Sequence, residues 1–204
     1  DVYKRQMLVG RAGSGKNHTL EQVAEALDLD FYFSNAVTQE YTLKGFIDAN
    51  GHFHETQFYK AFSQGGMFFL DEMDASIPEA LIVLNSAIAN GYFDFPIGRV
   101  RKHERFRVVS ASNTWGTGAN AVYIGRNQLD GATLDRFVQI EFDYDTELER
   151  GFTSDNDLYE FTIDLRKAID KTQTRAIVSM RALLNADKLN GVLPVDEIIK
   201  SVYI

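Results

Sequence analysis

The sequence contains no cysteine, only three prolines and a single tryptophan among its 204 residues. Without cysteine, disulfide bonds, thiol nucleophiles and zinc–thiolate sites are excluded, and such a composition is typical of a reducing compartment. No apolar run approaches the roughly 20 residues that a transmembrane helix needs, and no signal-peptide pattern opens the chain. We therefore expect a cytoplasmic protein that does not enter a membrane.

Basic residues are also scarce, because 21 lysines and arginines oppose 29 aspartates and glutamates, for a formal net charge of −8. A protein that binds nucleic acid or anionic membrane without sequence preference needs a positive surface. We therefore expect proteins rather than nucleic acid as partners, while a local basic patch would still allow a DNA-handling motor. The hydrophobic fraction of 45% is ordinary for a folded globular chain.

Short apolar runs alternate with helical patterns through the first two thirds of the chain. The predicted strands cover residues 7–9, 30–33, 67–70, 106–110 and 137–142. Strands that alternate with helices predict a three-layer α/β fold with a mostly parallel sheet. After Asp143 only amphipathic helices are predicted, over residues 159–169 and 180–189. We therefore expect an α/β core over residues 1–143 and a small helical domain over residues 144–204. With only six residues before the first strand, we also expect a fragment of a longer protein.

A glycine-rich segment follows the first predicted strand and precedes a predicted helix. Residues 10–16, GRAGSGK, fit the G-x-x-x-x-G-K pattern of P-loop proteins. Its backbone N–H groups and the helix N-terminus bind phosphate oxygens, and Lys16 would reach the β- and γ-phosphates of ATP. The predicted nucleotide-binding residues of this segment are Gly10, Arg11, Ala12, Gly13, Ser14, Gly15, Lys16, Asn17 and His18.

The position after the lysine departs from the pattern, because Asn17 stands where a serine or threonine hydroxyl normally binds Mg²⁺. An amide oxygen is a neutral oxygen ligand of the kind that Mg²⁺ accepts. We expect Asn17 to replace the hydroxyl, directly or through a water. The alternative is weakened metal binding, and therefore a subunit that binds nucleotide without hydrolysing it.

The predicted strand over residues 67–70 ends in the acidic pair Asp71 and Glu72. Behind a P-loop, an aspartate at a strand end holds Mg²⁺ through water, and we predict this role for Asp71. Glu72 would then act as the base that polarises the attacking water. A bare carboxylate metal cluster of Asp71, Glu72 and Asp74 is the alternative, but a nucleotide-bound Mg²⁺ explains these residues more simply.

With these motifs, the chain resembles the AAA+ ATPases, and within them the branch of MoxR-type, CobS- and NorQ-like and dynein-related ATPases. The resemblance covers nearly the whole chain and rests on the segments GRAGSGK, GMFFLDEMDA, FRVVSASN, YIGRNQLDGATLDRF and SMRALL, in this order. It implies Mg²⁺-dependent ATP hydrolysis by a core with a helical lid. It also implies assembly into a ring, with a hexamer as the expected size, that remodels a protein partner, often beside a companion protein.

The resemblance also assigns roles to four polar residues. Asn113 matches the sensor 1 residue, which positions the attacking water, and Arg181 matches sensor 2 on the lid. Arg136 matches the arginine finger, which reaches the γ-phosphate of the neighbouring subunit. Arg126 stands where this branch tends to keep a basic residue, in an accessory role or in trans, with a surface salt bridge as the alternative. The implied catalytic residues are Glu72, Lys16, Asn113 and Arg136.

Two further features keep other functions open. A P-loop kinase for small molecules would share Lys16, but it would need neither Asn113 nor the two-part layout.

Hairpins are predicted over residues 43–53 and 92–101, around turn signals such as Asn50-Gly51. Their aromatic side chains could either grip a partner or pack on the core.

Overall fold

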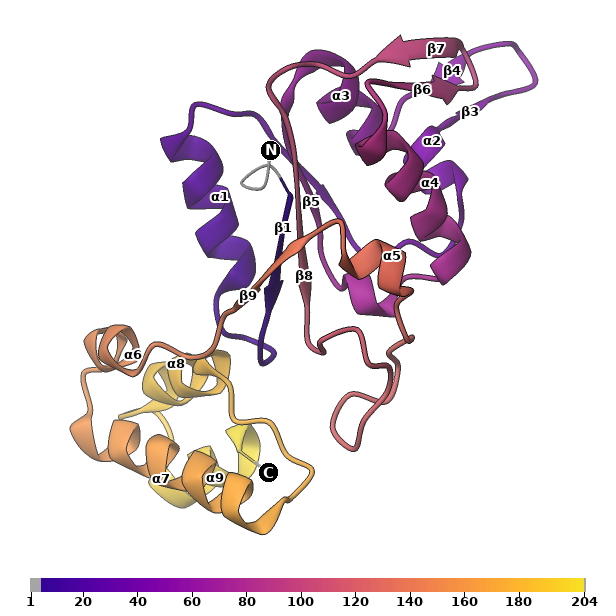
Figure 1. Cartoon of the computed structure of the whole chain (residues 1–204). Coiled ribbons are helices and arrows are strands. Elements are labelled where there is room, and N and C mark those ends of the chain that lie inside the picture. Colours follow the sequence, from indigo (N-terminus) through magenta and orange to yellow (C-terminus); the bar gives the residue numbers. More distant parts are fainter. Residues whose placement is uncertain (1–4, 204) are drawn as a thin grey trace. The chain divides into compact units, whose positions relative to one another are not determined.

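Figure 1 shows the computed structural model of the protein, which describes residues 5–203. The chain divides into two compact units. The first contains the chain up to Gly10 together with Lys16–Glu141, and the second contains Arg11–Gly15 together with the chain from Phe142 onward. Within residues 5–203, no helix is long and apolar enough to cross a membrane.

A five-stranded sheet forms the centre of the first unit. Its strands, in spatial order, are β2 (Phe31–Ser34), β5 (Gly66–Leu70), β8 (Phe106–Ser112), β1 (Arg5–Val9) and β9 (Val138–Glu141). Every pairing between them is parallel, with Phe68 opposite Val108 and Met7 opposite Ser110. All five strands therefore end at the same edge of the sheet. The predicted parallel α/β fold is confirmed.

Helices cover both faces of this sheet. Helix α1 (Lys16–Ala26) lies on one side, and α3 (Gln57–Gln64) and α4 (Pro78–Ala89) lie on the other (Figure 1). Pro78 stands in the first turn of α4, where its missing N–H costs no helical hydrogen bond. The short helices of this unit are α2 (Tyr41–Lys44) and α5 (Gly131–Leu134).

The core beneath α3 is built mainly from phenylalanine rings. Phe58 packs on Phe68 with ring centroids 5.1 Å apart, and Phe62 packs on Phe106 at 5.3 Å. All five residues of β5 are buried, as expected for a central strand that is covered on both faces. This rigid layer fixes the position at which β5 ends, and therefore the position of the acidic pair that follows it.

Both predicted hairpins are confirmed. They are the antiparallel pairs β3 (Phe46–Ile47) with β4 (Phe53–His54), and β6 (Tyr92–Phe95) with β7 (Gly98–Arg101). Phe93 is buried in the core, whereas the Tyr92 ring is exposed and lies 4.3 Å below the Arg99 guanidinium. The aromatic side chains of the second hairpin therefore divide between packing and the surface.

The described residues of the second unit form four helices: α6 (Thr146–Phe152), α7 (Asn156–Thr172), α8 (Met180–Leu189) and α9 (Val195–Val202). Side-chain oxygens cap three of them, because Asp145, Asp155 and Ser179 accept hydrogen bonds from the first-turn N–H groups of α6, α7 and α8. Leu183 and Ile198 form part of a small apolar core. The two helices predicted after residue 143 are present as α7 and α8.

Candidate active site

The topology of the sheet gathers the predicted site residues. The glycine-rich loop follows β1, Asp71 and Glu72 follow β5, and Asn113 follows β8. These three strands are neighbours in the sheet and run in the same direction. In parallel α/β sheets, ligands bind outside the carboxyl ends of the strands. The residues that the sequence separates by up to a hundred positions therefore meet at one edge.

The loop between β1 and α1 depends on glycine at two positions. Gly13 and Gly15 have φ angles of +73° and +93°, which residues with side chains rarely adopt. A Cβ atom at Gly13 would also lie 2.6 Å from Cβ of Ser179. Lys16 begins α1, is buried, and donates from Nζ to the Gly10 carbonyl oxygen at 2.8 Å. The loop thus leads into the amino end of α1, which favours phosphate.

The side chain of Arg11 is held by the second unit, to which residues 11–15 belong. Its guanidinium donates to both carboxylate oxygens of Asp170, at 3.1 and 3.0 Å. This hydrogen bond raises the pKa of Arg11 above its ordinary value. Tyr144 donates from its hydroxyl to the Ala12 carbonyl oxygen at 2.8 Å. Contact of residue 11 with a phosphate would therefore use its backbone N–H rather than its side chain.

Asn17 and Asp71 lie in direct contact. Nδ2 of Asn17 donates to Oδ2 of Asp71 at 2.8 Å, across 54 positions of sequence. Asn17 and the neighbouring His18 are exposed on the first turn of α1. Among residues 5–203, no group of three histidine, aspartate or glutamate side chains could hold a metal ion by itself. Asp71, Glu72 and Asp74 therefore do not form such a group among the described residues.

Glu72 has an unusual backbone and a charged partner. Its φ and ψ of 51° and 43° are left-handed, a conformation that is uncommon for residues other than glycine. Its Oε1 accepts a hydrogen bond from Nη2 of Arg126 at 2.8 Å. Arg126 lies in the loop between β8 and α5. The sequence allowed a role for Arg126 in trans, but here it contacts the glutamate of its own chain.

The Asn113 amide lies beside the same guanidinium. Because a guanidinium can only donate, the amide oxygen of Asn113 accepts from Nη2 of Arg126 at 2.9 Å. The amide nitrogen then donates to the Gly10 carbonyl oxygen at 3.2 Å. The reversed amide would place its oxygen 3.3 Å from Nζ of Lys16, but it would also set two donors 2.9 Å apart. Asn113 thus joins the glycine-rich loop to the Glu72 side of the site.

The sequence suggested Asp74 only as a metal ligand, and the structural role that it has in this site was missed. It lies in the 3₁₀ turn after β5 (Met73–Ala75) and is completely buried. Its Oδ2 accepts from the backbone N–H groups of Asn113 and Thr114 and from the Thr114 hydroxyl, at 3.1, 2.9 and 2.9 Å. Its Oδ1 lies 3.5 Å from Nε of Arg126. The available signal was an aspartate set between apolar Met73 and Ala75, where a solvated carboxylate is not expected.

The two remaining arginines lie elsewhere. Arg136 follows α5, and its guanidinium donates to the Ala132 carbonyl oxygen of its own chain. Arg181 is the second residue of α8 and is exposed on the second unit. Within the first unit, the structure therefore brings together Lys16, Asn17, Asp71, Glu72, Asn113 and Arg126.

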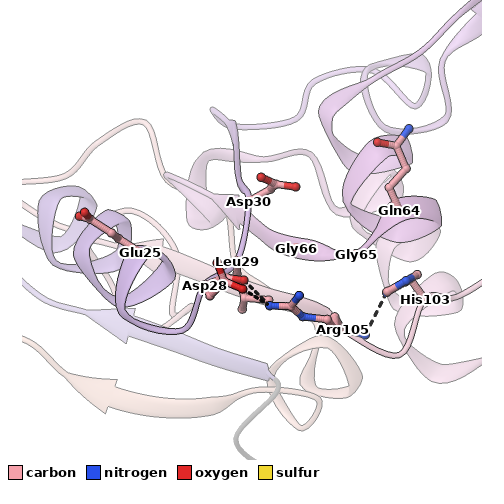
Figure 2. Close-up of a pocket in the computed structure, with 9 residues that line it drawn as sticks. All are labelled: Glu25, Asp28, Leu29, Asp30, Gln64, Gly65, Gly66, His103 and Arg105. Carbon is pink, nitrogen blue, oxygen red and sulfur yellow. Dashed lines mark hydrogen bonds and ion pairs between the residues drawn. The ribbon is translucent and has the colours of Figure 1, made fainter.

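A cavity of about 520 Å³ opens near the opposite edge of the sheet, beside the start of β2 and β5 (Figure 2). Two of its lining residues contact each other, because Arg105 donates to the backbone oxygen of Asp28 and lies 3.4 Å from its carboxylate. The backbone N–H of Arg105 also donates to Nδ1 of His103. This cavity lies at the amino ends of the strands and is distinct from the edge that carries the site.

A parallel sheet with a glycine-rich loop between its first strand and first helix defines a P-loop nucleoside-triphosphatase fold. The sequence matches the AAA domain family of the dynein-related subfamily over residues 6–137. The chain therefore belongs to this family.

Known proteins with similar sequences or structures agree with this fold. Uncharacterized proteins of Staphylococcus aureus strains USA300 and NCTC 8325 are 29% identical over 232 aligned positions, which cover this whole chain and 84% of theirs. NtrX from Brucella abortus superposes with a TM-score of 0.59 at 17% identity, and it was also solved with ATP. A putative ATPase from Cytophaga hutchinsonii gives 0.57 at 20% identity over 74% of this chain. The match to NtrX includes 98% of this chain but only 44% of NtrX. The match to the putative ATPase includes 45% of that protein.

Proposed function

We propose that the chain binds ATP with Mg²⁺ and hydrolyses it as one subunit of an AAA+ ring of the MoxR, CobS and NorQ type. The observation that carries this proposal is the grouping of Lys16, Asp71, Glu72 and Asn113 at the carboxyl edge of the sheet. In a member of the AAA family, this grouping supplies a phosphate-binding cation, a metal ligand, a base and a water-positioning amide.

The phosphates of ATP would be bound by the loop and by Lys16. Gly13 and Gly15 let the backbone N–H groups of the loop that begins at Gly10 turn towards a common centre, and the amino end of α1 adds its partial positive charge. Arg11, Ala12 and Ser14 would contribute through their backbone. Lys16 would exchange its bond to the Gly10 carbonyl oxygen for the β- and γ-phosphates.

The residues present fit a Mg²⁺ ion. Asn17 and Asp71 offer two oxygen-bearing side chains that already touch, and the exposure of Asn17 leaves room for the water ligands that Mg²⁺ retains. Mg²⁺ in this position would neutralise charge on the β- and γ-phosphates. Asn17 would ligate through its amide oxygen, because its amide nitrogen is occupied with Asp71.

Hydrolysis would use Glu72 and Asn113. Water attacks the γ-phosphorus as the bond to the ADP oxygen breaks, and the Glu72 carboxylate takes the proton of the water. Asn113 both donates and accepts, so it can orient that water. Arg136 would stabilise the transferred phosphoryl group of the neighbouring subunit, and Arg181 would contact the nucleotide from the helical lid over residues 144–204.

The partner is proposed to be a protein. A formal charge of −8 disfavours a nucleic-acid partner, since phosphate backbones are bound by clustered lysine and arginine. The exposed rings at the hairpins, Phe46 and Tyr92 among them, provide apolar surface for such contacts. We place this activity in the cytoplasm, where ATP is the common substrate of such motors.

Replacing Asn17 with threonine tests the metal site. If the amide oxygen binds Mg²⁺, Asn17→Thr should change the rate of phosphate release from Mg-ATP by less than about threefold, whereas Asn17→Ala should lower it about tenfold or more. The rates are measured with purified protein across Mg²⁺ concentrations. A large gain in Asn17→Thr would instead support a nucleotide-binding subunit that does not hydrolyse. ADP formed only with a small-molecule acceptor, without phosphate release, would support a kinase.

Mixing two inactive variants tests the ring. In a head-to-tail ring, a 1:1 mixture of Arg136→Ala and Glu72→Gln subunits forms complete sites at about a quarter of the interfaces, so it should recover about a quarter of the wild-type rate. Lys16→Ala mixed with Glu72→Gln is the matched control, because both residues serve the site of their own chain. A mixture of the first pair that is no more active than either parent contradicts the role of Arg136 in trans.

A further inference from the structure

Arg126 contacts three polar side chains of the site, those of Glu72, Asn113 and Asp74. Its side chain is 13% exposed, far less than that of a typical surface arginine. Nη2 donates to Oε1 of Glu72 at 2.8 Å and to the Asn113 amide oxygen at 2.9 Å. Nε faces Oδ1 of Asp74 at 3.5 Å. One planar group thus joins the residue proposed as the base to the residue proposed to orient the water.

We propose that Arg126 is a positioning residue for ATP hydrolysis that acts within its own subunit, by holding Glu72 and Asn113 in a fixed relation from an anchor on Asp74. The proposal rests on the proposed function and deepens it. It also changes the role that the sequence left open for Arg126, from a residue that reaches a neighbouring subunit to one that organises its own site.

Asp74 makes the anchor rigid. A buried carboxylate is costly unless it is paired and hydrogen-bonded. Oδ2 of Asp74 accepts hydrogen bonds from Asn113 and Thr114, whereas Oδ1 is paired with Nε of Arg126 at 3.5 Å by charge alone, without a hydrogen bond. The same carboxylate therefore fixes the backbone of Asn113 and the guanidinium that contacts its side chain. A displacement of Arg126 would release both ends of this arrangement at once.

The backbone of Glu72 supports the same conclusion. A left-handed glutamate persists only where the surrounding structure determines it, and such residues concentrate at functional sites. The hydrogen bond from Arg126 is one such determinant, because it holds the Glu72 carboxylate directly. A guanidinium committed to three groups of its own chain is not available to a neighbouring subunit.

The alternative is that Arg126 serves only as the counter-ion of Asp74, and Arg126→Lys separates the two roles. Lysine keeps the positive charge, but its single nitrogen cannot lie beside Asp74 and reach Glu72 and Asn113 at the same time, as Nε and Nη2 of Arg126 do. If Arg126 positions Glu72 and Asn113, Arg126→Lys should lower kcat about tenfold or more, because small misplacements at a reacting centre are costly. The affinity for a fluorescent ADP analogue and the unfolding midpoint should stay near wild type.

Arg99→Lys provides the matched control, because Arg99 donates two hydrogen bonds to an acidic partner, Asp94, but does so in an exposed pair on a hairpin away from the site. It should leave kcat and affinity unchanged. A kcat for Arg126→Lys equal to that of wild type would overturn the positioning role. A loss of ADP affinity as large as the loss of kcat would do so as well, since it would mean a general disruption of the site.

Mixed subunits then separate action in cis from action in trans. A 1:1 mixture of Arg126→Lys and Glu72→Gln should stay at the level of its parents, because each site lacks one of two residues of the same chain. Recovery towards about a quarter of the wild-type rate would show that Arg126 serves the neighbouring subunit, and would overturn the proposal. Failure of the Arg136→Ala mixture counts against the role of Arg136 in trans and does not bear on Arg126. A wild-type chain that binds ATP without hydrolysing it overturns the proposed function and this proposal together.

Discussion

Replacing Glu72 with glutamine is expected to lower kcat for ATP hydrolysis about 100-fold or more, the usual contribution of a general base. Glutamine keeps the size of the side chain and can still accept a hydrogen bond from Arg126, but it cannot take a proton from water. Lys16 and the glycine-rich loop are unchanged by this substitution. ATP should therefore bind with near wild-type affinity and remain bound without turnover.

The measurement pairs phosphate release with equilibrium binding of ATP. A fall in kcat at constant affinity marks an interaction used only in the transition state, whereas a matched loss of affinity marks a damaged site. Glu79→Gln is the control, because Glu79 is an exposed carboxylate in the first turn of the nearby helix α4. If Glu72→Gln retains more than a third or so of the wild-type rate, Glu72 is not the base.

The second large effect concerns stability and comes from a buried ion pair in the helical unit. Arg166 on α7 donates from Nη1 and Nη2 to the two carboxylate oxygens of Glu149 on α6, at 2.6 and 2.7 Å. Its Nε donates to the Val178 carbonyl oxygen, and its guanidinium lies 4.0 Å from the centre of the Tyr144 ring. Arg166→Ala would leave the Glu149 carboxylate buried without a partner. We expect a loss of about 3–5 kcal/mol in the free energy of unfolding.

Denaturant unfolding followed by far-ultraviolet circular dichroism reports on the helices of both units, while fluorescence of Trp115, the single tryptophan, reports on the first unit, so a transition seen only by circular dichroism belongs to the second unit. Lys167→Ala is the control, since the adjacent Lys167–Asp164 pair is exposed and should contribute about 1 kcal/mol at most. A double variant, Glu149→Leu with Arg166→Met, should recover most of the loss, because it removes both charges. An unchanged circular dichroism midpoint in Arg166→Ala would show that the pair does not hold the unit together.

The parts of the fold that follow from local pattern were predictable. The apolar run of β5, the glycines of the loop and the turn signals of the hairpins each determine their own backbone, so these elements appear where they were expected. The order of the strands was not predictable in this way. It depends on which apolar faces pack together across the whole core, for example Phe62 of α3 on Phe106 of β8.

The site was predictable where a motif carries its chemistry at fixed spacing, as in Lys16, Asp71 and Glu72. Arg126 shows where such reasoning stops. It contacts Glu72 across 54 positions of sequence, from a loop without periodicity, so nothing local distinguishes it from a solvated arginine. The buried pair of Arg166 and Glu149 was missed for the same reason, because charged residues on an amphipathic helix normally face water.

The left-handed backbone at Glu72 has a consequence for how this chain can change. A residue with a side chain costs about 1–2 kcal/mol in this conformation, and glycine would relieve most of that cost. Glycine would also remove the carboxylate that the site requires. Selection for a more stable fold and selection for turnover therefore act in opposite directions at this one position. The free energy of unfolding is therefore lower than it would be with glycine at this position, which lies just after the buried strand β5.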